Sequence, residues 1–151
     1  GEDDFPLILQ DRLFDHYGAL IYPANPMTLM QGARGNTIVV NGAVSPSARV
    51  PAGLVRLRLL NASNARNLDL SFEDGRAFHV IASDGGYLAS PVAATHLVIA
   101  PGERFEILVD FSNGREILLG TSPEPFPPMM MPRHIDQQES AQLRSRSAFQ
   151  K

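Results

Sequence analysis

The stretch from Leu54 to Asn67, LVRLRLLNASNARN, constrains the fold more than any other part of the chain. In its first half, from Val55 to Leu59, apolar residues alternate with arginines, and this period of two predicts a strand with one buried face. Asn61, Ser63 and Asn64 follow, and such side chains bind nearby backbone amides, so NASNA is predicted to form a compact turn. The rest of the chain is expected to form strands that pack against this one.

Turn-forming residues separate short apolar or β-branched runs throughout the sequence. The 12 glycines and 12 prolines are more than a helical protein accommodates, and they suit many short strands joined by turns. The runs predict about eight strands, at residues 7–11, 36–41, 54–60, 68–72, 77–83, 95–100, 104–111 and 116–121. The sequence therefore predicts an all-β protein, an antiparallel Greek-key sandwich or barrel.

Several connections carry more specific predictions. Residues 11–26 mix aromatic residues with glycine and prolines, which indicates a long connection packed on the barrel. Glu73 to Arg76 contains an Asp-Gly pair and predicts a hairpin turn. Residues 87–93, which include a proline, are expected to be irregular. Pro101 and Gly102 stand where a type II turn requires them.

A chain of 151 residues is expected to form one domain with a tail. We place the domain at residues 1–122 and a proline- and methionine-rich linker with a polar tail at 123–151. The composition changes from Ser122, where the sequence SPEPFPPMMMPRH begins, and its prolines predict an extended, polyproline-like segment. Residues 135–151 are polar and are expected to form a weak helix or to be disordered, with no convincing helix before them. Because the chain begins with glycine and has no signal region, we expect it to be an excerpt of a longer protein.

Composition argues against several classes of function. The net charge is -3, and the arginines are scattered singly, so no basic surface for nucleic acid is predicted. No apolar run approaches the roughly 18 residues that span a bilayer, so no membrane partner is predicted. The absence of cysteine from the sequence leaves no disulfide, thiolate nucleophile or zinc-thiolate site.

The four histidines are candidate metal ligands, because all-β domains of this size commonly bind copper. They are His16, His79, His96 and His134, and no two form a His-x-His pair that brings two imidazoles to one metal. A blue-copper site also needs a cysteine thiolate. His79, between inward-facing apolar neighbours, is predicted to be exposed or to lie at an interface.

One segment in the linker contains candidate ligands for a soft cation. Met129, Met130 and Met131 stand close to His134, and thioethers favour Cu(I). Alternatively, the three flexible methionines pin a proline-rich linker to an apolar surface. Both interpretations remain open.

The carboxylates and Arg66 do not predict a catalytic site. Asp84, Glu103 and Glu106 lie beside turns or on strand faces, and no pair has the spacing of a general acid and base. Asp84 is expected to order the turn at Gly85 by accepting backbone amides. Arg66 is expected to reach a buried carbonyl or carboxylate. No catalytic or cofactor-binding residue is predicted.

Five blocks of this sequence resemble the middle cupredoxin-like domain of three-domain bacterial multicopper oxidases, of the copper-efflux oxidase and laccase type. They are GEDDFPLILQDRLF, IVVNG, LVRLRLLNASNAR, VIASDGGYL and PGERFEILVDF, in the family's order and at compatible spacing. The resemblance implies a cupredoxin-like fold. In such enzymes the type 1 and trinuclear copper sites lie in the first and third domains, so no cofactor is expected in this chain.

The resemblance also implies a role. The middle domain would hold the flanking cupredoxin domains in register, and the intact enzyme would couple one-electron oxidation of Cu(I), phenols or metals to reduction of oxygen to water. A periplasmic location is implied in the same way. The partners would be the flanking domains of the same polypeptide, and apolar surfaces left exposed without them would favour self-association.

Two alternatives remain beside the oxidase interpretation. Some relatives keep the three cupredoxin-like domains without copper ligands and act as scaffold proteins of the cell envelope or division machinery. A middle domain does not distinguish the two. The other alternative is an autonomous Cu(I)-binding module that uses residues 129–134.

Overall fold

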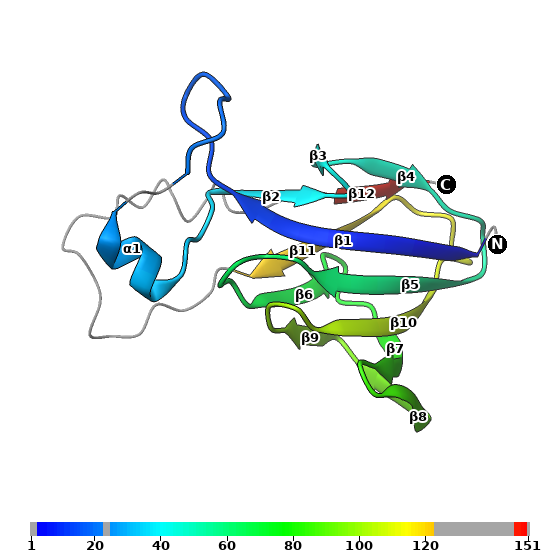
Figure 1. Cartoon of the computed structure of the whole chain (residues 1–151). Helices are drawn as coiled ribbons and strands as arrows, with labels where there is room; N and C mark the ends of the chain where they lie inside the picture. Colours follow the sequence, from blue (N-terminus) through cyan, green and yellow to red (C-terminus); the bar gives the residue numbers. More distant parts are fainter. Residues whose placement is uncertain (1–2, 23–24, 123–146, 151) are drawn as a thin grey trace.

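Two β-sheets form the body of the protein in the computed structural model, which describes residues 3–22, 25–122 and 147–150 (Figure 1). The first sheet has seven strands, in the order β3 (Ala43–Val44), β2 (Thr37–Val40), β1 (Asp4–Arg12), β5 (Leu54–Asn61), β10 (Arg104–Asp110), β7 (Phe78–Ser83) and β8 (Gly86–Ala94). The second has five, in the order β4 (Ser47–Arg49), β12 (Ser147–Gln150), β11 (Ile117–Ser122), β6 (Leu68–Phe72) and β9 (His96–Ile99). The prediction of an all-β sandwich is confirmed.

Strand β5 lies in the middle of the first sheet, as its alternation predicts. Val55, Leu57 and Leu59 are buried, whereas Arg56 and Arg58 point to the other face. β10 alternates in the same way, with Ile107 and Val109 buried. The inward residues of both sheets form one apolar cluster, because each strand contributes every second side chain to the space between the sheets.

The pairing of β1 with β5 departs from the predicted antiparallel arrangement. Leu7 is paired with Leu59 in a parallel register, and β12 and β4 are also parallel. The remaining pairs of named strands are antiparallel across the described part of the chain. Alternation predicts which face of a strand is buried but contains no information on the direction of its neighbour, so the parallel pairing of β1 with β5 was not predictable from this pattern.

The turn at residues 73–76 is not a hairpin turn, contrary to the prediction. It joins β6 in the second sheet to β7 in the first, so the chain turns a corner between sheets. Gly75 has φ of 69°, and its amide donates to the carbonyl of Phe72. The Asp-Gly pair therefore marks a tight turn, as predicted, but the two strands that it joins do not pair.

Three segments were predicted to lack the regular structure that they have. β8 is a strand although it contains Pro91, because it lies at the sheet edge, where a missing amide is tolerated. The register of β8 with β7 shifts between Val80 and Ala82, and this irregularity is consistent with the weak strand pattern in the sequence of β8. β12 is a strand inside the tail expected to be helical or disordered, and the short strands β3 and β4 lie in a predicted connection.

A short helix, α1 (Pro26–Gln31), was also missed within the loop region after β1. The Asn25 side chain caps it by accepting from the amide of Met27 at 2.8 Å, and Pro26 occupies the first turn. The capping asparagine and the proline are both visible in the sequence, but the helix that they begin has only six residues. Residues 123–146, which include Met129, Met130, Met131 and His134, lie outside the described residues, and the domain boundary at 122 stays a prediction.

The turn at residues 73–76 also contains an ion pair that shifts the pKa of its carboxylate. The Asp74 carboxylate accepts from the Arg76 guanidinium at 2.8 Å, and this hydrogen bond holds the pKa of Asp74 below its ordinary value of 3.8. A lowered carboxylate pKa stabilises the fold above the unfolded pKa, and the contribution is lost as pH falls through the folded pKa.

We expect Asp74→Asn to lower the free energy of unfolding near neutral pH, and the difference from the wild type to shrink as pH falls below 3.8. Urea unfolding at several pH values measures it. Glu73→Gln removes an equal charge one residue away and serves as the control. A difference for Asp74→Asn that stays constant across this range contradicts the assignment.

Candidate functional site

Three of the histidines predicted not to bind metal lie on separate elements of the described fold. His16 is exposed in the loop after β1, His79 is exposed on β7, and His96 is exposed on β9. His96 Nδ1 lies 3.4 Å from Asp69 Oδ1, which makes a surface pair rather than a ligand set. Among the described residues, no group of three or more histidine, cysteine, aspartate or glutamate side chains is placed to hold a metal ion.

A cluster of polar side chains is buried at one end of the sandwich. We call Asp11, Asn61, Ser63 and Arg66 the polar cluster. Asp11, Asn61 and Ser63 are buried, and the side chains of Arg66 and Asp11 are 12% and 1% exposed. The cluster joins the ends of β1 and β5 to the turn that the sequence NASNAR forms.

Asp11 and Arg66 form the centre of the cluster. Asp11 Oδ2 accepts from Arg66 Nε at 3.0 Å and from the amide of Gly35 at 2.6 Å. Arg66 Nη2 donates to the carbonyl of Gly35 at 2.8 Å, and the amide of Asp11 donates to Ser63 Oγ at 3.2 Å. The prediction that Arg66 reaches a buried carbonyl or carboxylate is confirmed, since it reaches both.

Asn61 holds the turn in place from inside the core. Its Nδ2 donates to the carbonyls of Arg66 and Ile99, each at 2.8 Å, and its Oδ1 accepts from the amide of Ser63 at 3.0 Å. Buried amide groups are stable only when their hydrogen bonds are made. The predicted turn therefore depends on its first residue, the buried Asn61, which ties it to the core through Ile99.

The turn before β10 packs against the same asparagine. The amide of Glu103 donates to the carbonyl of Ala100, and Gly102 has φ of 86°, as the predicted type II turn requires. The amide of Gly102 donates to the carbonyl of Asn61 at 2.8 Å. The two most recognisable turns of the sequence thus meet at one point.

Asp84 plays a different part from the one predicted. Its carboxylate accepts from the guanidinium and the amide of Arg104, so it links the end of β7 to the start of β10. The guanidinium hydrogen bond lowers the pKa of Asp84 from its ordinary value. The prediction placed the partners of Asp84 in the adjacent glycine turn and missed Arg104, which is 20 residues away in sequence.

An open cleft of about 340 Å³ lies beside the polar cluster. Its lining comes from the end of β1, the following loop, the segment after α1 and the NASNAR turn: Asp11, Arg12, Leu13, Leu20, Ile21, Tyr22, Ala33, Arg34, Gly35 and Asn64. Gly35 is required on one side, because an added Cβ would collide with the backbone of Arg12. The cleft combines apolar side chains with two arginines.

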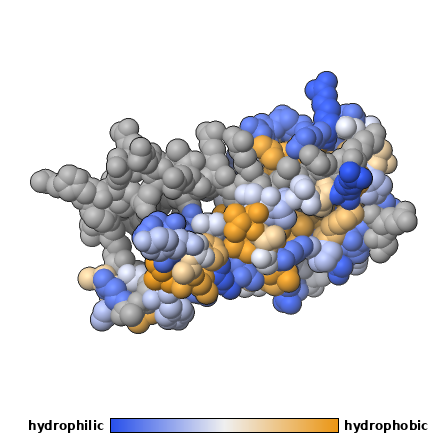
Figure 2. Space-filling view, turned by 90° about the horizontal axis from the view of Figure 1, so that it is seen from above, coloured by the Kyte–Doolittle hydropathy of each residue, from blue (hydrophilic) through white to orange (hydrophobic). Residues whose placement is uncertain are grey.

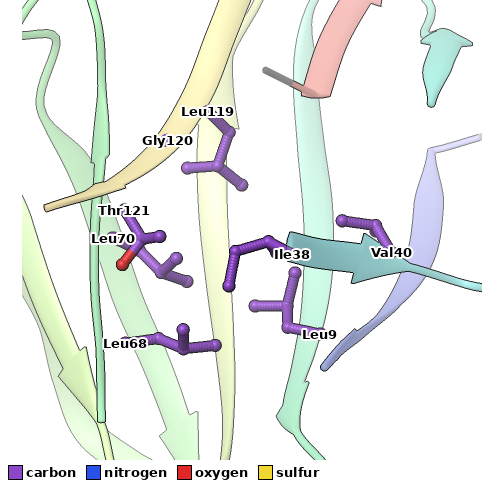
Figure 3. A pocket seen from close by; sticks show the side chains of 8 residues that line it. All are labelled: Leu9, Ile38, Val40, Leu68, Leu70, Leu119, Gly120 and Thr121. Carbon is purple, nitrogen blue, oxygen red and sulfur yellow. The ribbon is translucent and has the colours of Figure 1, made fainter. Parts of the chain in front are cut away.

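A second cavity lies between the sheets and is too small for a ligand. Its volume is about 10 Å³, at the lower limit for one water molecule. Figure 3 shows its lining side chains, which are Leu9, Ile38, Val40, Leu68, Leu70, Leu119, Gly120 and Thr121. Thr121 Oγ1 already accepts from the amide of Asp69, so this cavity is a packing gap in an apolar core.

The loop region between β1 and β2 exposes many large apolar side chains. We call residues 13–22 and 25–35 the arm; its first part stands away from the sandwich, and α1 lies at the end opposite the N-terminus (Figure 1). The exposed side chains include Leu20 at 64%, Tyr22 at 77% and Met30 at 86%. Seen from above, the molecule shows hydrophobic patches among hydrophilic residues (Figure 2).

Comparison with known proteins identifies the family. The family described as "Multicopper oxidase" matches residues 13–117, which covers most of the sandwich. This chain belongs to the multicopper oxidase family. Its two sheets are a cupredoxin-like domain of that family, as the resemblance implied.

Solved multicopper oxidases share the fold of the domain. A laccase-like multicopper oxidase CueO from Ochrobactrum sp. is 50% identical, with a TM-score of 0.73 over 79% of this chain and 27% of its own. A variant of the multicopper oxidase McoA from Aquifex aeolicus is 33% identical, with a TM-score of 0.77 over 98% of this chain and 31% of its own.

Curated relatives of the domain bear a different name. "Cell division protein FtsP" of Sodalis glossinidius is 52% identical over 119 residues, and that of Escherichia coli is 50% identical over 119 residues. These matches cover 79% and 78% of this chain and 24% of each relative. The multicopper oxidase domain thus spans about a quarter of the length of these relatives.

The buried charge pair at the end of the multicopper oxidase domain can be tested by mutation. Asp11→Asn leaves the buried Arg66 guanidinium without its carboxylate, so we expect the free energy of unfolding to fall by about 3–5 kcal/mol in urea denaturation. The matched control is Asp4→Asn, which breaks a pair with Arg58 whose side chains are 30% and 47% exposed. The control should lose less than about 1 kcal/mol. Equal losses for the two variants contradict the assigned role of Asp11.

Proposed function

We propose that this chain is the copper-free central domain of a three-domain multicopper oxidase-type protein. It holds the flanking domains of the same polypeptide in register. The observation that carries the proposal is the position of His16, His79 and His96, which lie on separate elements of a domain whose family is built on copper chemistry. Copper ligands of the whole protein would then come from outside this chain.

The exposed arm supports the same role. Large apolar side chains are exposed in it from Tyr17 to Met30, although the sandwich core beside it is closed. An apolar patch of this kind marks a surface that another protein part covers. Because the domain spans about a quarter of its relatives, the rest of the polypeptide supplies enough chain to cover the arm.

The whole protein would be an exported oxidase. In this proposal it couples one-electron oxidation of Cu(I), phenols or metals to reduction of oxygen to water, in the periplasm. The similarity to a laccase-like oxidase that is 50% identical supports it. The second candidate is a copper-less scaffold of the envelope or division machinery, favoured by relatives named cell division proteins at 50–52% identity.

The docking role predicts a difference between the isolated chain and the full-length protein. The double substitution Leu20→Ser and Met30→Ser changes side chains that are 64% and 86% exposed in the isolated chain, so its unfolding temperature should stay nearly constant. In the full-length protein the same change should lower the unfolding temperature by several degrees, measured by calorimetry.

The control for the docking role is Val98→Ser. Val98 lies on β9, an edge strand of the second sheet, and is 60% exposed. It should have little effect in either protein if the arm alone is covered. Equal, small shifts for the arm variant in both proteins would show that nothing docks on the arm.

Copper analysis of the full-length protein distinguishes the two candidates. The oxidase should hold several copper ions, show the intense visible absorption band that makes type 1 copper proteins blue, and oxidise phenols, whereas the scaffold should do none of these. The 151-residue chain should stay colourless in both cases. Tight stoichiometric Cu(I) binding by this chain, lost when Met129, Met130 and Met131 are replaced, would instead establish the autonomous copper module.

A further inference from the structure

The first part of the arm is a small hairpin, residues 13–21, which we call the arm hairpin. The amide of Ile21 donates to the carbonyl of Leu13 at 2.8 Å, and the amide of Asp15 donates to the carbonyl of Ala19 at 2.9 Å. Figure 1 shows this loop standing away from both sheets. A two-stranded hairpin is marginally stable in water, so its shape needs support beyond its own backbone pairing.

The tip of the arm hairpin is fixed by Asp15 and Gly18. The amide of Gly18 donates to the carbonyl of Asp15 at 3.0 Å, and Gly18 has φ of 82°, which closes a three-residue hairpin loop that favours glycine at this position. Asp15 Oδ1 accepts from the amides of Tyr17 and Ala19 at 2.9 and 2.8 Å. The carboxylate of the arm hairpin is therefore engaged inside its own turn.

The base of the arm hairpin is held by Asn36. Its Oδ1 accepts from the amide of Phe14 at 3.1 Å, and its Nδ2 donates to the carbonyl of Phe14 at 3.0 Å. The asparagine side chain thus makes the two hydrogen bonds that a neighbouring strand would make. Phe14 also pairs with Leu20 across the hairpin. The tip and the base are both ordered within this chain.

The side chains that the arm hairpin presents are uncharged and aromatic or apolar. Tyr17 is 84% exposed and Leu20 is 64% exposed, and His16 is exposed beside them. The rings of His16 and Tyr17 lie against each other, with their centroids 3.7 Å apart. Residues 16–21 contain no aspartate, glutamate, lysine or arginine. The surface that complements this protruding tip is a concave, uncharged one.

An exposed tyrosine on an ordered loop is suited to binding. A tyrosine buries a large apolar area, and few of its bonds lose rotational freedom when it docks. Residues that dominate binding are enriched in tyrosine and lie in pockets that exclude water. Because the tip is ordered beforehand, it loses less conformational entropy on docking than a flexible loop would.

We propose that the arm hairpin inserts the rings of His16 and Tyr17 into an uncharged, apolar pocket on a flanking domain of the same polypeptide. This partner depends on the proposed function, in which a central domain holds its neighbours. The domain spans about a quarter of the length of its curated relatives, so a polypeptide of that length supplies the pocket. The tip, rather than the whole arm, then provides most of the docking free energy.

The test compares Tyr17→Ala with Tyr17→Phe by calorimetry. In the 151-residue chain neither substitution should shift the unfolding temperature by more than about one degree, because Tyr17 is exposed. In the full-length protein Tyr17→Ala should lower it by about three degrees or more, and Tyr17→Phe, which keeps the ring, by less than half as much. No loss with Tyr17→Ala, or equal losses for the two variants, overturns the proposal.

Alkylation gives a second measurement that does not depend on stability. This chain contains no cysteine, so Ala19→Cys places a single thiol at the tip, and peptide mapping separates it from cysteines elsewhere in the full-length protein. Iodoacetamide should alkylate position 19 at least about tenfold more slowly in the full-length protein than in the 151-residue chain. The control Asn113→Cys, in an exposed turn, should react at similar rates in both. Equal rates at position 19 contradict insertion of the tip.

The arm variant separates failure of this proposal from failure of the docking role. If Leu20→Ser with Met30→Ser destabilises the full-length protein and Tyr17→Ala does not, the arm docks but its tip is not inserted. If neither change destabilises the full-length protein, nothing docks on the arm, and both proposals are wrong.

Discussion

The buried pair between Asp11 and Arg66 is the interaction on which the end of this domain depends. A charge inside a protein is unfavourable unless it is paired and its remaining hydrogen bonds are made. Here both charged groups bind Gly35: the Asp11 carboxylate accepts from its amide, and the Arg66 guanidinium donates to its carbonyl. The pair is therefore satisfied only when the end of β1, the NASNAR turn and the segment before β2 are all in place.

This arrangement separates the domain into two functional parts. The sandwich buries an apolar core to which strands of both sheets contribute. The arm and the cleft are built on the polar cluster, and the arm exposes apolar side chains to whatever lies beside the domain. A central domain that positions its neighbours would need both parts, because only a rigid body can transmit a fixed orientation.

The patterns that sequence analysis could use were those of single strands and single turns. The alternation around Leu57 predicted its burial, and Pro101 with Gly102 predicted a type II turn, because both properties depend on neighbouring residues. These patterns did not predict which strands lie next to each other. The parallel neighbour of β5 and the corner after β6 are determined by contacts between distant segments.

The candidate site shows the same division. A buried acceptor for Arg66 was predicted, but Asp11 as that acceptor was not, since 55 residues separate the two. The cleft had no signal at all, because its lining comes from four separate segments of the chain. The β8 strand was missed for another reason: Pro91 opposes a central strand, and only the sheet order reveals an edge.

The parallel contact between β1 and β5 also affects how the chain is made. Asp11 is bonded to Ser63, 52 residues later, so the first strand emerges long before the strand that flanks it. At about 5–20 residues per second, a ribosome would leave β1 without this neighbour for roughly 3–10 seconds. Contacts of such long range slow folding, because the intervening loop must close first. The apolar face of β1 is thus exposed during synthesis, when it is open to chaperones and to misassembly alike.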